Sequence, residues 1–168
     1  MKSRFARRLA LVLALVVPGA APALGQGAAV DILDFGLYAA GPFQHVPAPE
    51  QLSGQRWIAP NIRLLERTDT IPGHLGRIFG FRYRVNDPRL FGKPLKLRIL
   101  HPRLAAPSGR SGTETGRPEV VDAAAPERGY FFAFEETWEI AEGDWTFQVV
   151  HEGRVLAEKK FRVVVAMY

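Results

Sequence analysis

The sequence predicts an all-β protein, an immunoglobulin-like two-sheet antiparallel sandwich of about seven strands with little or no helix in the mature chain. Three observations lead to this class. Apolar and polar residues alternate with the period of two that is typical of a strand with one buried face. No stretch of the mature chain sustains the 3.6-residue period of an amphipathic helix. Clusters of glycine, proline, asparagine and aspartate separate the alternating runs and predict turns.

The clearest single element is a β-hairpin over residues 142–165, around which the rest of the sandwich is organised. Trp145, Phe147 and Val149 alternate with polar or smaller residues and predict the core face of its first strand. Glu152-Gly153 predicts a tight reversal, because glycine tolerates the positive φ that a two-residue hairpin turn requires. The second strand resumes the same period with Val155, Ala157, Lys159, Phe161, Val163 and Val165.

The first 25 residues have the composition of a secretory signal peptide. Basic residues near the N-terminus precede an apolar run, Leu9–Val17, which is about half the length of a bilayer-spanning helix. Small residues then predict cleavage before Gln26, with Ala28 as an alternative last residue of the signal. The sequence therefore predicts a signal peptide (1–25) and one β-sandwich domain (26–168). The mature protein is expected in the periplasm or secreted, with no transmembrane segment after cleavage.

Charge and cysteine content exclude several classes. The chain contains no cysteine, so it has neither a disulfide framework nor a lipoprotein attachment site. Its formal charge of +5 includes four bases within the predicted signal and falls to about +1 in the mature chain. The remaining charge is unevenly distributed, with residues 77–117 carrying ten bases against two acids and residues 119–168 carrying ten acids against five bases. We expect no nucleic-acid partner for a protein outside the cytoplasm.

Residues 28–38 predict the first strand. Its alternation places two sets of apolar residues on opposite faces, Leu33, Phe35 and Leu37 on one and Val30 and Ile32 on the other.

Two segments read as long surface loops. Residues 40–60 contain four prolines, which neither a helix nor a central strand can accommodate, and Phe43 and Trp57 are expected to pin this segment to the sheet. Residues 101–126 include a polar tip at 108–116 that lacks the apolar content needed to offset the entropy of ordering. We expect this tip to be mobile.

The strands between these loops follow the same alternation. Residues 61–67 predict a second strand and residues 68–73 a turn. Residues 77–86 give the best strand of the first half, with four apolar residues on the core face and two arginines on the other. The next predicted strand covers 95–100, and a further strand follows the second loop. The core residues predicted for these three strands are Phe79, Phe81, Tyr83, Val85, Leu95, Leu97, Ile99, Tyr130, Phe132 and Phe134.

Four cations are the candidate ligand-binding residues. Arg82 and Arg84 share one strand face, and Lys96 and Arg98 share a face of the next strand. If these strands are sheet neighbours, the four side chains form one patch that could contact phosphate, sulfate or carboxylate groups. The alternative is that they pair across strands with acids of residues 119–158, which would neutralise both charge runs.

No catalytic or metal-binding motif is evident, and no cofactor is implied. Nucleophilic hydrolysis requires a serine or cysteine beside a base, whereas the candidate serines lie in predicted turns without an adjacent histidine. The histidines are not spaced as metal ligands, and neighbouring carboxylates on a strand point to opposite faces. Glycines near residue 76 lack the strand-to-helix context of a phosphate-binding loop. The histidines, serines, carboxylates and glycines in question are His45, His74, His101, His151, Ser53, Ser108, Ser111, Glu135, Glu136, Glu139, Glu142, Gly73, Gly76 and Gly80.

Four segments together resemble a bacterial family known as domain of unknown function 3859. They are DILDFGLY in the first strand, GRIFGFRYRV, the strand that ends in His101-Pro102, and the closing GDWTFQVVHEGRVLAEKKFRVV. The resemblance covers residues 30–165 and implies the sandwich fold, but it supplies no catalytic residues.

The sequence therefore predicts an exported, non-catalytic binding or accessory module of the bacterial envelope. Its partner would be an anionic ligand contacted through the basic strand face, or an envelope protein. An envelope protein could also pair with an exposed strand edge of the sandwich. The alternative from another class is a hydrolase or metal-dependent enzyme that uses His101 and His151.

Overall fold

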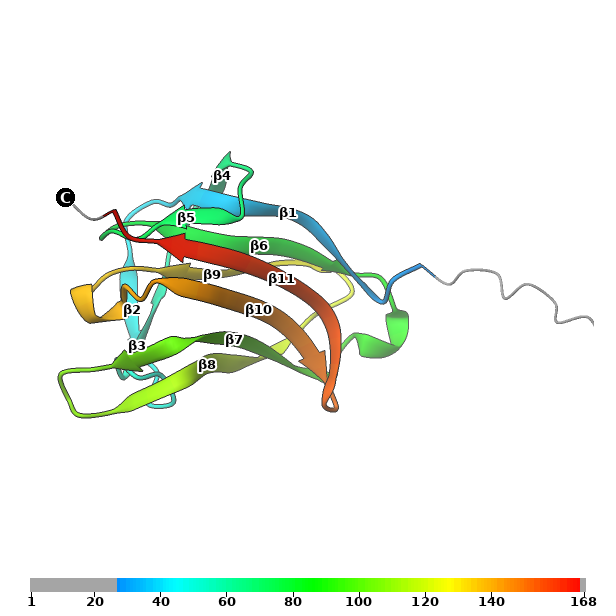
Figure 1. Cartoon of the computed structure of the whole chain (residues 1–168). Coiled ribbons are helices and arrows are strands. Elements are labelled where there is room, and N and C mark those ends of the chain that lie inside the picture. Colours follow the sequence, from blue (N-terminus) through cyan, green and yellow to red (C-terminus); the bar gives the residue numbers. More distant parts are fainter. Residues whose placement is uncertain (1–26, 167–168) are drawn as a thin grey trace, which may run out of the picture.

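The computed structural model describes residues 27–166, so the predicted signal peptide lies outside the described residues. Two β-sheets pack face to face, and a separate hairpin crosses one end of the sandwich (Figure 1). The four-stranded sheet has the order β4 (Arg63–Glu66), β1 (Val30–Ala39), β6 (Ile78–Val85), β9 (Glu127–Ala133). The five-stranded sheet has the order β5 (Thr70–Pro72), β11 (Arg154–Val164), β10 (Gly143–His151), β7 (Pro94–Ala105), β8 (Ser111–Val120).

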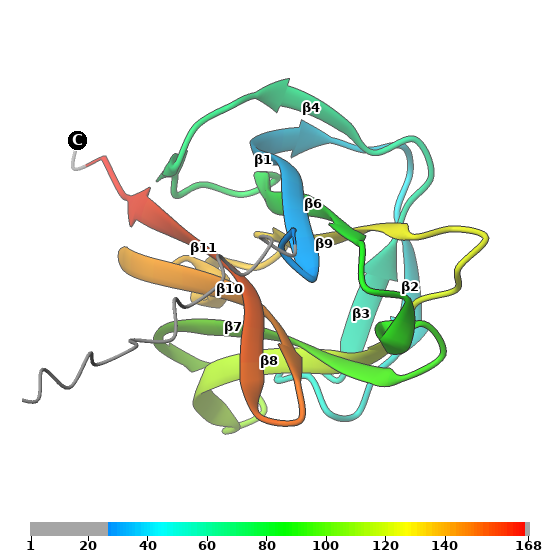
Figure 2. The same ribbon diagram turned by 90° about the vertical axis from the view of Figure 1, so that its right-hand side faces the viewer.

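The crossing hairpin consists of β2 (Gln44–Pro47) and β3 (Gln55–Ile58), whose strands run steeply across those of the two sheets (Figures 1 and 2). Helical structure in residues 27–166 is limited to two short 3₁₀ turns, η1 (Pro88–Leu90) and η2 (Thr137–Glu139). None of the helices in this part of the chain has the length and apolar character needed to span a bilayer. The all-β prediction is therefore confirmed, although the described residues form eleven strands rather than about seven.

The closing hairpin is confirmed as β10 and β11. Trp145, Phe147 and Val149 are fully buried, and Glu152 and Gly153 have φ angles of 47° and 78° in the turn. Positive φ at both turn residues is the geometry of a type I′ hairpin, whose twist matches that of the flanking strands. β10 lies between β11 and β7 in the five-stranded sheet, which explains why it contributes so much of the core.

An aromatic cluster joins the two sheets. The ring of Phe79 on β6 lies 5.6 Å from Trp145, 5.4 Å from Phe147 and 5.6 Å from Phe161, measured between centroids. These edge-to-face pairs bury large apolar surfaces, which stabilises a sandwich without disulfides. The predicted core face of residues 77–86 is confirmed, because all four of its apolar residues are buried.

The first strand differs from its prediction at a bulge. The register between β1 and β6 shifts between Ile32 and Asp34, so one extra residue is accommodated there. As a consequence, four residues of β1 all pack in the core: Val30 and Ile32 before the bulge, and Phe35 and Leu37 after it. The predicted division of these residues into two opposite faces is therefore wrong. The shift also places Asp34 on the outer face of the sheet.

Both predicted long loops contain strands. In the first, Phe43 and Trp57 stack at a centroid distance of 4.9 Å and pack on Tyr38 and Ala133, so the expectation that they pin this segment to the sheet is confirmed. In the second, the expectation of a mobile tip is wrong, because β7 continues to Ala105 and β8 pairs with it from Ser111 onward. Backbone hydrogen bonds order this segment despite its polar composition.

The predicted turn at residues 68–73 contains a further short strand, β5, which pairs with β11 in parallel. This is the one parallel pair among the described strands.

Candidate functional site

The four predicted cations lie on different sheets. Arg82 and Arg84 are on β6, whereas Lys96 and Arg98 are on β7. β6 belongs to the four-stranded sheet and β7 to the five-stranded sheet, with the core between them. The cations point away from this core, so the two pairs face opposite sides of the sandwich. The prediction of one four-cation patch is therefore wrong, because the chain crosses between sheets after β6 instead of forming a hairpin.

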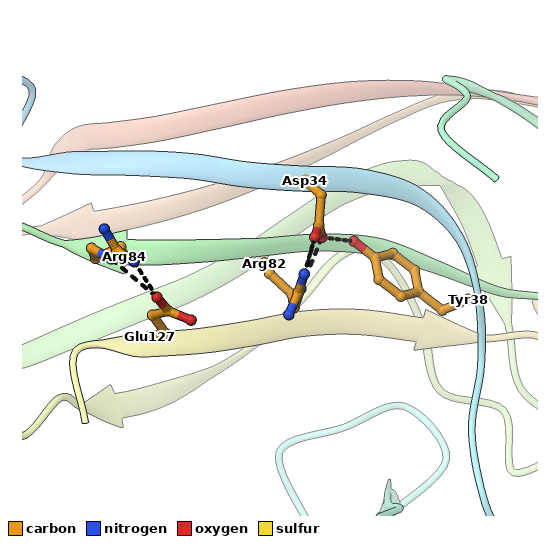
Figure 3. A network of polar contacts seen from close by, with 5 residues as sticks. All are labelled: Asp34, Tyr38, Arg82, Arg84 and Glu127. Atoms are coloured by element: carbon orange, nitrogen blue, oxygen red, sulfur yellow. Dashed lines mark hydrogen bonds and ion pairs between the residues drawn. The ribbon is translucent and has the colours of Figure 1, made fainter. Parts of the chain in front are cut away.

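Arg82 belongs to a network on the outer face of the four-stranded sheet (Figure 3). The buried carboxylate of Asp34 accepts hydrogen bonds from the Tyr38 hydroxyl at 2.5 Å and from Arg82 Nε at 2.9 and 3.0 Å. Burial alone would raise the pKa of Asp34, but the hydrogen bonds from Arg82 and Tyr38 outweigh it and hold the pKa below its ordinary value. Asp34 therefore remains ionised and compensates the charge of Arg82.

The other predicted cations also have partners. Arg84 pairs with Glu127 on the neighbouring strand (Figure 3), and Lys96 Nζ lies 2.6 Å from Glu114 Oε1. Arg98 Nε donates to Gln148 Oε1 at 2.8 Å, and Gln148 in turn donates to Glu158 at 2.6 Å. Of the four cations, Arg84 pairs with an acid of residues 119–158 as the alternative expectation requires. Asp34 and Glu114 lie outside that stretch, and Arg98 bonds to a neutral amide. Anion binding by these cations stays a prediction.

The histidines do not converge. His101 and His151, the residues of the enzymatic alternative, lie beside the β7–β10 ladder, in which Leu100 pairs with Thr146 and Lys96 with Val150. Continuing this register places the two histidines six ladder positions apart, or about 20 Å along the strands. Within residues 27–166, no group of three or more potential metal-ligating side chains lies close enough together to hold a metal ion.

His101 is buried against Trp145, with ring centroids 5.0 Å apart. Its Nδ1 lies 2.8 Å from the carbonyl oxygen of Pro102, and its Nε2 has no hydrogen-bond partner among the described residues. Burial lowers the pKa of His101, so the ring is neutral in the folded protein. This environment makes it a core residue.

A groove of about 310 Å³ opens on the side of the sandwich where β9 and β8 are the edge strands. One wall is a continuous run of β9, residues 129–133, and the opposite wall is β3 with the residue that follows it, 55–59. Its floor includes inward-facing residues of β7 and β8. The remaining lining side chains are Gln51, Ser53, Ile62, Ile99, Thr115, Arg117, Glu135 and Glu139.

The loop between β2 and β3 closes one side of this groove. Gln51 Nε2 donates to the carbonyl oxygen of Gly116 at 2.7 Å, and Gln51 Oε1 accepts from the Thr115 hydroxyl. Arg110 also donates to the carbonyl oxygen of Pro49 at 3.0 Å. These contacts hold the crossing hairpin against the edge of β8.

A buried carboxylate lies at the end of the groove near Ala133. Glu139 Oε2 accepts backbone hydrogen bonds from Glu135 at 2.8 Å and Glu136 at 3.0 Å. Burial nevertheless raises the pKa of Glu139 above its ordinary value. Glu135 beside it pairs with His45 Nε2 at 2.7 Å, which ties the crossing hairpin to the segment between β9 and η2.

Sequence reasoning missed this arrangement. The sequence predicts only that neighbouring carboxylates on a strand point to opposite faces and so do not converge. The 3₁₀ turn η2 instead folds Glu139 back onto the backbone of Glu136 as a capping box. The spacing of Glu136 and Glu139 was the available signal, whereas nothing in the sequence indicated the role of Gln51.

Comparisons with known proteins are consistent with this fold. A family model described as "Domain of unknown function (DUF3859)" matches residues 26–163. The crystal structure of an immunoglobulin-like protein from Pseudomonas aeruginosa is similar with a TM-score of 0.59 at 26% identity, covering 83% of this chain and 100% of that chain. The immunoglobulin-like prediction is thereby confirmed.

Two further comparisons supply no functional relative. Pseudomonas fluorescens alkylpurine DNA glycosylase AlkC, bound to DNA with an abasic site analog, matches with a TM-score of 0.31 and 15% identity over 56% of this chain and 27% of that chain. At this TM-score the likeness carries no argument about fold or activity. No curated protein sequence matches this chain.

Proposed function

The chain belongs to the DUF3859 family, as its sequence resemblance predicted, and we propose that it is an exported accessory module of the bacterial envelope that acts by binding. The site of binding in this proposal is the groove between β9, β8 and β3. The family's lack of an assigned activity and the immunoglobulin-like relative are both consistent with an accessory role.

The composition of the groove carries the proposal. Its volume of about 310 Å³ is at the lower end of the range for small-ligand sites. Aromatic residues of β9 and Trp57 line it together with polar groups of Gln51 and Thr115, and Glu139 places a carboxylate at one end. Apolar walls combined with a few fixed polar groups are typical of recognition sites.

Binding accounts for these features better than catalysis does. A hydrolase needs a nucleophile beside a base, or a metal with converging ligands. The hydroxyl of Ser53, which lines the groove, donates to the backbone carbonyl of Gln55 at 2.8 Å. His101 and His151 lie at separate positions along the sheet, about 20 Å apart. The cationic alternative is weakened by the partners of Arg82, Arg84, Lys96 and Arg98.

Export and localisation rest on the sequence. The predicted signal peptide directs the chain to the periplasm or the medium, and the absence of cysteine is compatible with either. The partner in this proposal is an envelope protein, since nucleic acid is not available in these compartments.

The test compares residues 26–168, which contain both sheets, with two tryptophan variants. Ala59→Trp fills the groove, and Ala124→Trp adds the same side chain to an exposed loop as a matched control. Thermal melts are recorded with zinc chloride, inorganic phosphate, heparin and phosphatidylglycerol vesicles in turn. They are also recorded with two octapeptides, one of alternating valine and lysine and one of alternating valine and glutamate. At a hundredfold its dissociation constant, a bound probe stabilises the fold by about 2.7 kcal/mol.

We expect an octapeptide to raise the melting midpoint of the wild type and of Ala124→Trp, but not that of Ala59→Trp. A zinc-dependent rise that a chelator reverses would favour the metal-dependent alternative. A salt-sensitive rise with phosphate or heparin that survives Ala59→Trp and is lost in Arg82→Ala would favour the cationic surface. Either of these results, or no response to any probe, contradicts binding in the groove.

A further inference from the structure

The hydrogen bonds at one end of β9 fix the direction of its backbone groups. Phe134, the residue after β9, donates its N–H to the carbonyl oxygen of Arg77 at 2.9 Å and accepts from the N–H of Gly76 at 2.8 Å. Both of its backbone groups therefore point toward the chain that leads into β6. The ladder between β6 and β9 then continues from Ala133 to Glu127 without a register shift.

Alternate residues of an antiparallel strand direct both backbone groups to the same neighbour. Tyr130 and Phe132, like Phe134, therefore bond to β6. Gly129, Phe131 and Ala133 have the opposite direction, and their N–H and C=O groups point to the free edge of β9. Because residues 129–133 form a wall of the groove, these groups line it. The run of five residues spans about 14 Å.

The other sheet edges are protected in ways that natural proteins commonly use. Gln51 bonds to the backbone carbonyl of Gly116 on β8. β5 has three residues and ends in Pro72, which has no N–H to offer a partner. β4 has four residues and carries Arg63 and Glu66 at its ends. Of the four edge strands of the two sheets, β9 contributes the longest continuous run of residues to the lining of this groove.

The chemistry at the Ala133 end of the groove is acidic. Both backbone hydrogen bonds to Glu139 end on Oε2, and Oε1 accepts none from the part of the chain that the structure describes. Glu135 and Glu136 lie beside it, and Glu135 is paired with the ring of His45. A ligand with a positively charged group at this position would complement three carboxylates.

We propose that the groove binds an extended basic peptide as an added strand. The peptide backbone pairs with the outward N–H and C=O groups of Gly129, Phe131 and Ala133, and a lysine or arginine side chain reaches Glu139. This inference rests on the proposed function, because it names the partner class for the same groove. Strand addition provides affinity through the backbone, and the side-chain contact provides selectivity.

Residue-resolved hydrogen exchange by NMR tests the strand addition. The probe is an octapeptide of alternating valine and lysine, compared with one of alternating valine and glutamate. In the free protein, amides of Gly129, Phe131 and Ala133 should exchange at least a hundredfold faster than those of Tyr130 and Phe132. Adding the valine–lysine peptide should slow exchange at the three odd-numbered positions by tenfold or more.

Glu139→Gln tests the side-chain contact, since the amide oxygen can still accept the two backbone hydrogen bonds. We expect it to abolish the preference for the lysine peptide over the glutamate peptide, with about a tenfold loss in affinity for the former. Glu142→Gln, an exposed carboxylate after the same turn, is the matched control and should retain the preference.

The outcomes separate the two proposals. Suppose that the lysine peptide raises the melting midpoint, that Ala59→Trp removes this rise, and that the odd-numbered amides stay unprotected. The groove then binds the peptide without strand addition, and only the inference is overturned. If a different probe binds in the groove and neither peptide does, the inference fails in the same way. If Ala59→Trp leaves peptide binding unchanged, both proposals fail.

Discussion

Replacement of Asp34 by asparagine tests the polar network of Figure 3. The wild-type carboxylate accepts from the Tyr38 hydroxyl at 2.5 Å and from Arg82 Nε at 2.9 and 3.0 Å. Asparagine has nearly the same shape, but it loses the charge and places an NH₂ donor where one acceptor was. The variant therefore removes the interaction while leaving the packing of β1 almost unchanged.

The expected loss of stability follows from exposure. The Arg82 side chain is 47% exposed, so water replaces much of its interaction and we assign about 1 kcal/mol to that pair. The Asp34 side chain is only 12% exposed, and its bond from the Tyr38 hydroxyl contributes about 1–2 kcal/mol. Together they amount to about 2–3 kcal/mol, or about 6–12 °C in melting midpoint for a domain of this size.

The effect should depend on pH in a defined direction. Because the pKa of Asp34 is lower in the folded state than in the unfolded state, its contribution is complete above about pH 4. It disappears as the pH falls through the folded-state pKa. The difference between wild type and Asp34→Asn should therefore be full at pH 7 and shrink toward pH 2.

Urea unfolding monitored by tryptophan fluorescence at pH 7, 5 and 3 measures this difference. Asp31→Asn is the control, since Asp31 is an exposed carboxylate on the same strand that bonds to Asn86, and we expect it to cost less than about 0.5 kcal/mol. Equal stability of Asp34→Asn and wild type at pH 7, or a difference that does not shrink in acid, would refute the reasoning.

Three further substitutions have defined outcomes. His101→Phe keeps the ring packing on Trp145 and removes a buried nitrogen that has no partner. Because burial lowers the pKa of His101, the wild type should lose stability below about pH 6.5, whereas the variant should not. Urea titrations at pH 7.5 and 5.5 measure this difference. Glu139→Gln should raise the melting midpoint at pH 7 by about 2–4 °C, because burial raises the pKa of Glu139 and disfavours its ionised form. This gain should diminish toward pH 5, because the wild type becomes more stable as Glu139 takes up a proton. Gly80→Ala should cost about 3 kcal/mol or more in urea, because the added Cβ would lie 2.1 Å from the carbonyl oxygen of Tyr130 at a φ of 153°.

The closing hairpin shows what the sequence could predict. Trp145, Phe147 and Val149 alternate without interruption, and the turn contains a glycine at the position that needs positive φ. Local pattern and tertiary packing agree there, which is the condition under which sequence reasoning succeeds. The same holds for β6, whose four predicted core residues are all buried.

The failures have identifiable physical causes. The bulge before Asp34 changes which residues of β1 face the core, and a period of two cannot anticipate it. The position of the predicted cations depended on the path of the chain after β6. A loop with turn residues can lead to a neighbouring strand or cross to the other sheet, and nothing in the loop itself distinguishes these paths. β8 was missed because its ladder is formed by backbone groups, which composition does not report.

The groove escaped prediction for a related reason, since its walls come from distant segments. Residues 55–59 and 129–133 meet across it, and the contacts of Gln51 that hold the crossing hairpin on β8 span more than sixty residues of chain. Alternation in β9 correctly marked Tyr130 and Phe134 as core residues. It gave no information about which sheet edge β9 would occupy or what would lie opposite it.

The two buried carboxylates differ in how well the fold stabilises their ionised form. This difference distinguishes Asp34, which supports the fold, from Glu139, which we propose binds a partner. Asp34 has a guanidinium and a hydroxyl as partners, its pKa falls, and the ionised form stabilises the sandwich. Glu139 has two backbone donors on one oxygen and further carboxylates nearby, and its pKa rises, so the ionised form is a cost to stability at neutral pH. Destabilising charges concentrate at sites that act on a partner. A cation supplied by a bound peptide would remove that cost, which couples occupation of the groove to stability of the domain.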